Sequence, residues 1–163
     1  MTVITISRQY ESGGDEIARQ LCDRLGYRFL DKDLMASLGV QAGSVALVQN
    51  FIRATHGQGG AVILGRGGQV ALRDMPDVLH VRVVAPLETR IRRVQEREGL
   101  TADKAREQVS VSDQASAGYV KHYYHADPAD PSLYDLVINT SKITPVVAAD
   151  LVIQAMACLP ILA

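Results

Sequence analysis

The sequence predicts a three-layer α/β domain built around a parallel sheet. Four short, nearly continuous apolar runs, at residues 3–6, 61–64, 78–84 and 136–138, have the composition of strands that are buried on both faces. Segments with helical spacing lie between these runs, and such alternation predicts right-handed crossovers. A chain of 163 residues is about the size of one domain, so residues 1–163 are expected to form a single domain.

The helices are predicted from their apolar spacing and end signals. Residues 17–25 carry a large apolar side chain at every fourth position and stop at Gly26, a typical helix C-terminus. Pro86 can occupy the first position of the helix that carries Leu87. Two later helices have the apolar stripes Leu87, Ile91 and Val94, and Val147, Leu151 and Ala155.

The connecting regions are less regular. Residues 33–60 contain five glycines around one helix-like stretch at 45–54, which predicts a loop, a helix and a second loop. Residues 127–134 are rich in Pro and Asp and predict a turn before the last strand.

Composition excludes several functional classes. The formal net charge is −1, so no global basic field attracts nucleic acid or an anionic membrane, and any anion site must be local. The two cysteines show no ligand spacing and fit a reduced, cytoplasmic setting. The first residues lack secretory-signal features, and the apolar C-terminal stretch is too short to cross a bilayer. We interpret residues 159–163 as a candidate interface of a homodimer.

The most informative segment is residues 4–18, which read as a buried strand, a short loop with paired glycines and a helix. This layout is typical of a phosphate-binding loop, where backbone N–H groups meet phosphate oxygens at a helix N-terminus. The P-loop side-chain pattern is not matched. Aligned on it, Arg8 replaces the first glycine, Gly14 replaces the lysine and Asp15 replaces the hydroxyl residue.

Five segments, taken in order, resemble the cytidylate kinase-like family of P-loop proteins, which lacks the usual P-loop lysine. The strings are ISRQYxSGGxEIA, GYRFxDKxL, AVILGRGG, DVLHVRVVAPLETRIRRVQEREGLT and SLYDLVINTS. The resemblance implies a P-loop NTPase fold with a five-stranded parallel sheet flanked by helices. It also implies a shortened acceptor region at 33–60 and a helical lid at about 99–126.

The same resemblance implies ATP and Mg²⁺ as cofactors and small nucleotides as substrates. The expected nucleotide-phosphate site comprises Ser7, Arg8, Gln9, Tyr10, Ser12, Gly13, Gly14, Asp15 and Glu16. The expected catalytic side chains, which would neutralise the transferred phosphoryl group or hold the acceptor, are Arg8, Arg66, Arg93 and Asp113.

Three of these residues have alternative interpretations. Asp15 is a candidate Mg²⁺ ligand, or an acid that complements the helix dipole. Arg66 is a candidate acceptor-phosphate ligand, or a structural arginine paired with Asp74, Asp77 or a helix C-terminus. Arg90, Arg93 and Arg97 share one face of the helix at 86–98, and this face contacts the donor nucleotide through Arg93 or Arg97, or is simply solvated.

Three departures from the family separate two functional hypotheses. Glu11 stands where the family has glycine, the neighbours of Asp113 are not arginines, and residues 33–60 are short, either truly or because a flexible stretch is missing. The first hypothesis is ATP-dependent phosphoryl transfer to a nucleoside monophosphate such as CMP. The second is a catalytically inactive nucleotide-sensing or scaffold domain of the same fold.

Overall fold

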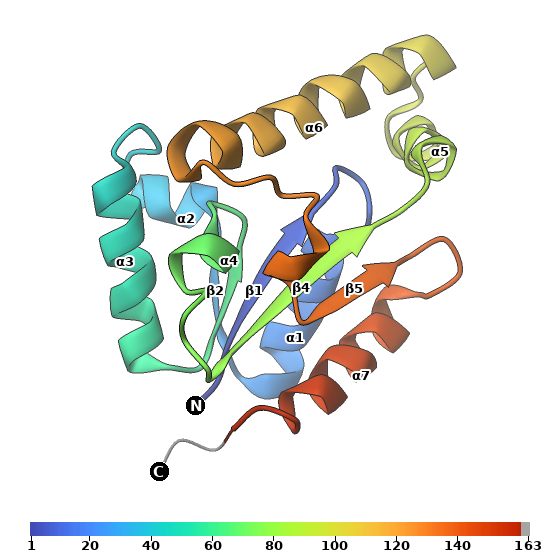
Figure 1. The fold of residues 1–163 in the computed structure, drawn as a ribbon. Helices are drawn as coiled ribbons and strands as arrows, with labels where there is room; N and C mark the ends of the chain where they lie inside the picture. Colours follow the sequence, from blue (N-terminus) through green and yellow to red (C-terminus); the bar gives the residue numbers. More distant parts are fainter. Residues whose placement is uncertain (161–163) are drawn as a thin grey trace.

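A computed structural model describes residues 1–160 and contains a parallel sheet of five strands in the order β2-β3-β1-β4-β5 (Figure 1). The strands are β1 (Val3–Arg8), β2 (Arg28–Leu30), β3 (Ala61–Leu64), β4 (Val78–Val84) and β5 (Leu136–Asn139). The predicted parallel α/β architecture is confirmed. Strand β2 was missed because it has only three residues, and its two ends are an exposed arginine and a buried leucine.

Helices cover both faces of the sheet. The helices are α1 (Gly14–Leu25), α2 (Lys32–Ser37), α3 (Val45–Gln58), α4 (Gly68–Ala71), α5 (Leu87–Glu98), α6 (Ala102–Tyr124) and α7 (Pro145–Met156), and a 3₁₀ turn, η1, spans Pro131–Leu133. On one face, Ile4 and Ile6 pack with residues of α1 and α7. On the other, Val3 and Ile63 pack with α2 and α3. The alternation along β1 therefore produces the three predicted layers.

The prediction of loop, helix and loop for residues 33–60 is partly wrong. Helix α2 begins at Lys32, capped by the carboxylate of Asp31, which accepts the N–H of Leu34 at 2.8 Å. Helix α3 also continues four residues beyond the predicted end at Ala54, and this extension includes Thr55, which is buried and donates its hydroxyl to the carbonyl of Phe51. Apolar periodicity does not reveal a side-chain N-cap such as Asp31 or the tertiary burial of Thr55.

The predicted apolar stripe of the last helix is wrong at two of its three positions, since only Ala155 packs against the core. Val147 and Leu151 are exposed, whereas the buried side is formed by Ala148, Ala149 and Val152. Small residues are buried here because α7 lies directly against α1 and the sheet. The helix start at Pro86 is off by one residue, since Pro86 precedes α5, but the predicted stop at Gly26 is confirmed by its left-handed backbone.

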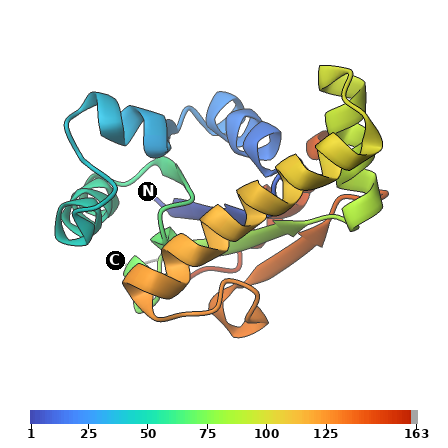
Figure 2. The same cartoon turned by 90° about the horizontal axis from the view of Figure 1, so that it is seen from above.

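Helix α6 runs across the carboxyl ends of the strands, as the two views in Figures 1 and 2 show. It follows α5 after a short turn and is capped by Thr101. Within residues 1–160, no helix is both long and apolar enough to span a bilayer. The last three residues of the 159–163 segment lie outside the described part of the chain, so the homodimer interface remains a prediction.

Candidate phosphate-binding loop and adjoining cavity

The loop between β1 and α1 has an open helix N-terminus. Gly13 precedes α1 in a left-handed conformation (φ 92°), and within residues 1–160 no side chain caps the helix. The first-turn N–H groups therefore remain available to an anion, which the helix dipole also favours. Ser12 is fully buried, and its hydroxyl has no hydrogen-bond partner among the described residues. These features fit a phosphate group.

Gly14 is required by a close contact with Arg8. A Cβ at Gly14 would lie 2.6 Å from the Cβ of Arg8, so a larger residue could not keep this loop conformation. The Nε of Arg8 in turn donates to the exposed carboxylate of Asp15 at 2.8 Å. The two charged residues predicted for phosphate and Mg²⁺ thus neutralise each other.

Glu11 adopts a backbone conformation that favours glycine. Its φ is 60°, in the left-handed region that costs a residue with a Cβ about 1–2 kcal/mol. Its carboxylate forms an ion pair with Arg97 of α5, so the acidic side chain is also neutralised. A glycine would adopt this conformation without strain, whereas the glutamate of this chain is strained.

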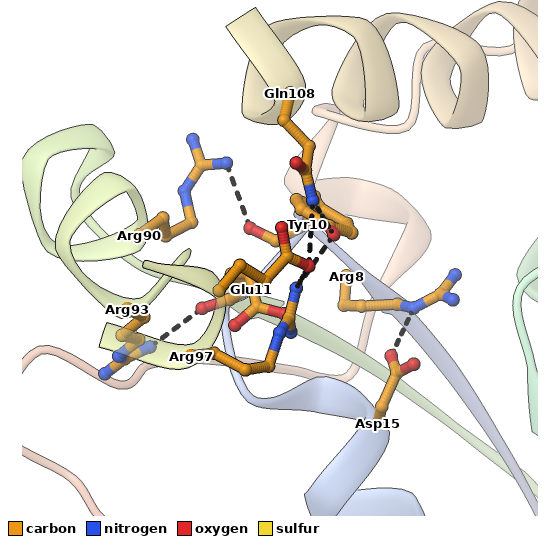
Figure 3. A network of polar contacts seen from close by, with 9 residues as sticks. Arg8, Tyr10, Glu11, Asp15, Arg90, Arg93, Arg97 and Gln108 are labelled. Carbon is orange, nitrogen blue, oxygen red and sulfur yellow. Dashed lines mark hydrogen bonds and ion pairs between the residues drawn. The ribbon is translucent and has the colours of Figure 1, made fainter. Parts of the chain in front are cut away.

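Three arginines of α5 converge on the loop (Figure 3). Arg90 donates to the carbonyls of Ala85 and Tyr10, and Arg93 donates to the carbonyl of Glu11 at 3.0 Å. Arg93 also bonds to Thr140, and burial lowers its pKa. The solvated-face interpretation is wrong for Arg90, which is 4% exposed. These arginines fix the loop to the neighbouring elements.

Asp113 of α6 also holds the loop. One carboxylate oxygen accepts the N–H of Tyr10 at 2.8 Å, and the other accepts Arg90 at 2.7 Å. Gln108, one turn earlier on α6, donates to the Tyr10 hydroxyl at 2.9 Å (Figure 3). The helix that was predicted to form the lid is therefore bonded to the loop in this structure.

A cavity of about 360 Å³ adjoins the loop, between the carboxyl ends of β1, β3 and β4 and the second half of α6. Its size is in the range of small-ligand sites. Its lining contains more basic than acidic side chains. The charged ones are Arg8, Lys32, Arg66, Arg82, Lys121, Asp113 and Asp127. Carboxyl ends of parallel strands are the usual place for ligands in such sheets.

Among the predicted site residues, Ser7, Arg8, Gln9, Arg66 and Asp113 line this cavity. Arg66 follows β3 with a left-handed backbone (φ 56°), and its guanidinium lies 4.6 Å from the ring centroid of Tyr119. The alternative of an ion pair with Asp74 or Asp77 is wrong, because these residues pair with Arg73 and His56. The Arg93 side chain lies instead on the Thr140 side of the loop.

Sequence reasoning missed Arg82. This residue interrupts the apolar run of β4, and its side chain donates to the Ser7 hydroxyl at 2.6 Å. The parallel register places Ser7 beside Arg82 and Thr5 beside His80. The period-two polar alternation in both strands was the available signal, because it marks a sheet face that is not purely apolar.

The expected Mg²⁺ site is only partly supported by side chains. Within the described residues, no group of three acidic, histidine or cysteine side chains could hold a metal ion. Magnesium, however, commonly binds one or two carboxylates together with substrate phosphates and water. The carboxylate of Asp15 is suited to this role once its ion pair with Arg8 opens. Asp15 is therefore compatible with a Mg²⁺ ion that is also held by a nucleotide.

The fold is that of the P-loop kinases. A shikimate kinase from Acinetobacter baumannii, solved with shikimate, superposes with a TM-score of 0.61 at 15% identity, covering 97% of this chain and 94% of that one. An uncharacterized protein from Eubacterium ventriosum superposes with a TM-score of 0.89 at 26% identity, covering 96% and 99%.

The family follows from the sequence comparison. The model of the cytidylate kinase-like family matches residues 3–45 and 40–142, and the chain belongs to this family. A cytidylate kinase from Ignicoccus hospitalis is 27% identical, covering 89% of this chain and 93% of that protein. A uronate isomerase from Corynebacterium glutamicum is 33% identical over 128 residues, or 78% of this chain, which spans only 25% of that protein. The resemblance predicted from the motifs is confirmed.

Proposed function

We propose that this protein transfers the γ-phosphoryl group of ATP to a small anionic acceptor, with a nucleoside monophosphate such as CMP as the leading candidate. The observation that carries the proposal is the adjacency of two anion sites. An uncapped helix N-terminus after a glycine-paired loop borders a cavity with an excess of basic side chains. A kinase needs a donor and an acceptor site that meet in this way.

The residues have separate roles in this proposal. Backbone N–H groups of residues 13–16 bind the donor phosphates, with Asp15 as the carboxylate ligand of Mg²⁺. Arg8 lines the cavity and neutralises charge on the transferred group, while Arg66 holds the acceptor. Arg93 and Asp113 act as positioning residues, because their polar atoms bond to the loop and its neighbours. The bond from γ-phosphorus to ADP breaks as one to an acceptor oxygen forms.

The region assignments belong to the same proposal. Residues 99–126, with α6, form the lid, and residues 33–60 form a shortened acceptor region. The family model matches the chain in two segments that overlap at residues 40–45. This break in the match supports a difference in length between this chain and the family model at that place. In this proposal residues 1–163 work as one domain in the cytoplasm, and their substrates are small nucleotides.

A second candidate, a nucleotide sensor without catalysis, is favoured by one observation. Two of the charged loop residues already have partners, since Arg8 pairs with Asp15 and Glu11 pairs with Arg97. A nucleotide must separate Arg8 from Asp15 to use Arg8 fully. If this exchange is incomplete, the protein binds a nucleotide but does not align its γ-phosphate.

ADP release in the presence of ATP, Mg²⁺ and CMP separates the two candidates when it is measured beside a thermal-shift titration of each nucleotide. Turnover that requires CMP and is abolished in Arg8→Ala supports the kinase. A nucleotide-dependent rise in melting temperature with no ADP release supports the sensor. A protein that shows neither response contradicts both.

A further inference from the structure

Arg82 is a partly buried arginine at the base of the cavity. It lies in the fifth position of β4, within a strand whose other side chains are mostly apolar. The one hydrogen bond that its side chain makes within residues 1–160 goes to the neutral hydroxyl of Ser7. The Tyr134 hydroxyl donates to the same oxygen at 3.2 Å, so Ser7 is shared between two neighbours.

This arginine lacks the carboxylate partner that a structural arginine usually has, and its contact with the Tyr134 ring is a distant one, with 6.0 Å from the guanidinium carbon to the ring centroid. Among residues 1–160, no carboxylate lies within 4.0 Å of its guanidinium, whereas Arg90 bonds to Asp113 and to two carbonyls. A guanidinium has five N–H donors, and a charge removed from water without compensation is costly. Burial is the main cause that lowers the pKa of Arg82, and the positive charge of Arg8 acts in the same direction, whereas Tyr134, Asp113 and Asp127 act against it without reversing the shift. The folded protein therefore holds two neighbouring cations that repel each other.

The charges around Arg82 favour an anion. Of the two carboxylates on the cavity lining, that of Asp113 is engaged by Arg90 and Tyr10. The other, Asp127, is exposed and accepts the N–H of Ala129 at 3.0 Å. Five basic side chains line the same space. A phosphate or carboxylate group would supply the missing acceptors, and the planar fork of an arginine suits both.

We propose that Arg82 binds the anionic group of the acceptor at the base of the cavity, and so selects charged acceptors over uncharged ones. This inference rests on the proposed kinase function and adds a specificity-determining residue to it. The chemistry that the cavity recognises is a planar or tetrahedral oxyanion. Phosphate monoesters and sugar carboxylates are two sources of this chemistry, and they can be compared directly.

Titration calorimetry with two matched ligand pairs tests the inference. CMP is compared with cytidine, and gluconate with sorbitol, on the wild type, Arg82→Met and Arg92→Met. Arg92 is exposed on α5 and serves as the matched control. We expect the wild type and Arg92→Met to bind the anionic member of one pair about tenfold or more tightly than its neutral partner. In Arg82→Met, this preference should fall to less than about threefold.

Melting in the absence of ligand separates this role from a structural one. Because methionine keeps the aliphatic stem and removes an uncompensated charge, Arg82→Met should melt at the same temperature as the wild type or higher. A clearly lower melting temperature, or failure to fold, contradicts the inference. Arg82→Lys, which keeps the charge but loses the fork, should retain only part of the preference, and full retention would also count against it.

The failure of this inference differs from failure of the proposed function. A wild type that prefers the anionic ligand, together with an Arg82→Met variant that keeps the whole preference, overturns the role of Arg82 alone. A wild type that binds none of the four ligands overturns both the acceptor site and the role of Arg82.

Discussion

Arg90 of α5 and Asp113 of α6 are joined by a hydrogen-bonded ion pair of 2.7 Å, in which the arginine is almost fully buried. The second oxygen of the same carboxylate accepts the N–H of Tyr10. One side chain thus connects two helices to the loop that precedes α1. Asp113, which resembles a catalytic aspartate by sequence, is in this structure an anchor of the loop.

Substitution of Asp113 by alanine should be strongly destabilising. It leaves the buried Arg90 guanidinium and the Tyr10 N–H without their partner, and removal of one member of a buried pair typically costs about 3–5 kcal/mol. Urea denaturation measures the free energy of unfolding. Arg106→Ala is the matched control, because its ion pair with Glu88 also joins α5 and α6 but is exposed, and should contribute less than about 1 kcal/mol. Equal losses in the two variants would contradict the anchoring role.

Glu11 can be tested by separating its backbone from its charge. Glu11→Gly and Glu11→Ala both remove the ion pair with Arg97, but only glycine is unstrained at a φ of 60°. The glycine variant should therefore unfold with a free energy about 1 kcal/mol higher than that of the alanine variant. Chemical denaturation of both proteins checks this difference. Equal stabilities would mean that the left-handed conformation is not retained in solution.

His80 predicts a pH dependence of stability. Burial lowers the pKa of His80 below its usual value of 6.5, so the unfolded chain binds a proton more readily than the folded one. The stability associated with neutral His80 is complete above about pH 6.5, and it is lost as the pH falls from there toward the lowered pKa. The free energy of unfolding of the wild type should fall more steeply than that of His80→Gln over this window. Parallel pH profiles would show that His80 titrates normally.

The two cysteines should differ in reactivity. Burial raises the pKa of the Cys22 thiol to about 11, and Asp23 adds to the effect, whereas Cys158 is exposed. Since the thiolate is the nucleophile, Cys22 should be alkylated much more slowly than Cys158 at neutral pH. Mass spectrometry of the iodoacetamide-treated protein measures both rates, with Cys158→Ser as the control. Comparable rates would contradict the burial of Cys22.

The sequence predicted the features that depend on local patterns. The paired glycines Gly13 and Gly14, with a buried strand before them and a helix after them, predict a strand, a tight loop and a helix at this place. Strand β2 and helix α2 were missed because each is too short to show a period. The bond between Arg90 and Asp113 joins residues 23 positions apart in the chain, and only the folding of α5 against α6 brings them together.

Arg82 shows why the candidate site was harder to predict than the fold. A single arginine in an apolar run does not disturb the strand prediction, and its importance depends on which residues line the space above it. That information arises only when β1, β4 and α6 are assembled. The roles assigned to Arg8, Arg66 and Asp15 likewise remain predictions that depend on a bound nucleotide.

The central claim is that residues 8–16 bind the phosphates of a nucleotide. Titration calorimetry with Mg²⁺ and ATP tests it on the wild type, Gly14→Ala and Gly118→Ala. A Cβ at Gly14 would collide with Arg8, whereas one at Gly118 on α6 meets no atom within 4 Å. We predict that the wild type and Gly118→Ala bind ATP. Gly14→Ala should lose at least about tenfold in affinity, the size expected when one charged contact to phosphate is displaced. Equal ATP affinity in all three proteins, or no binding by the wild type, would contradict the claim.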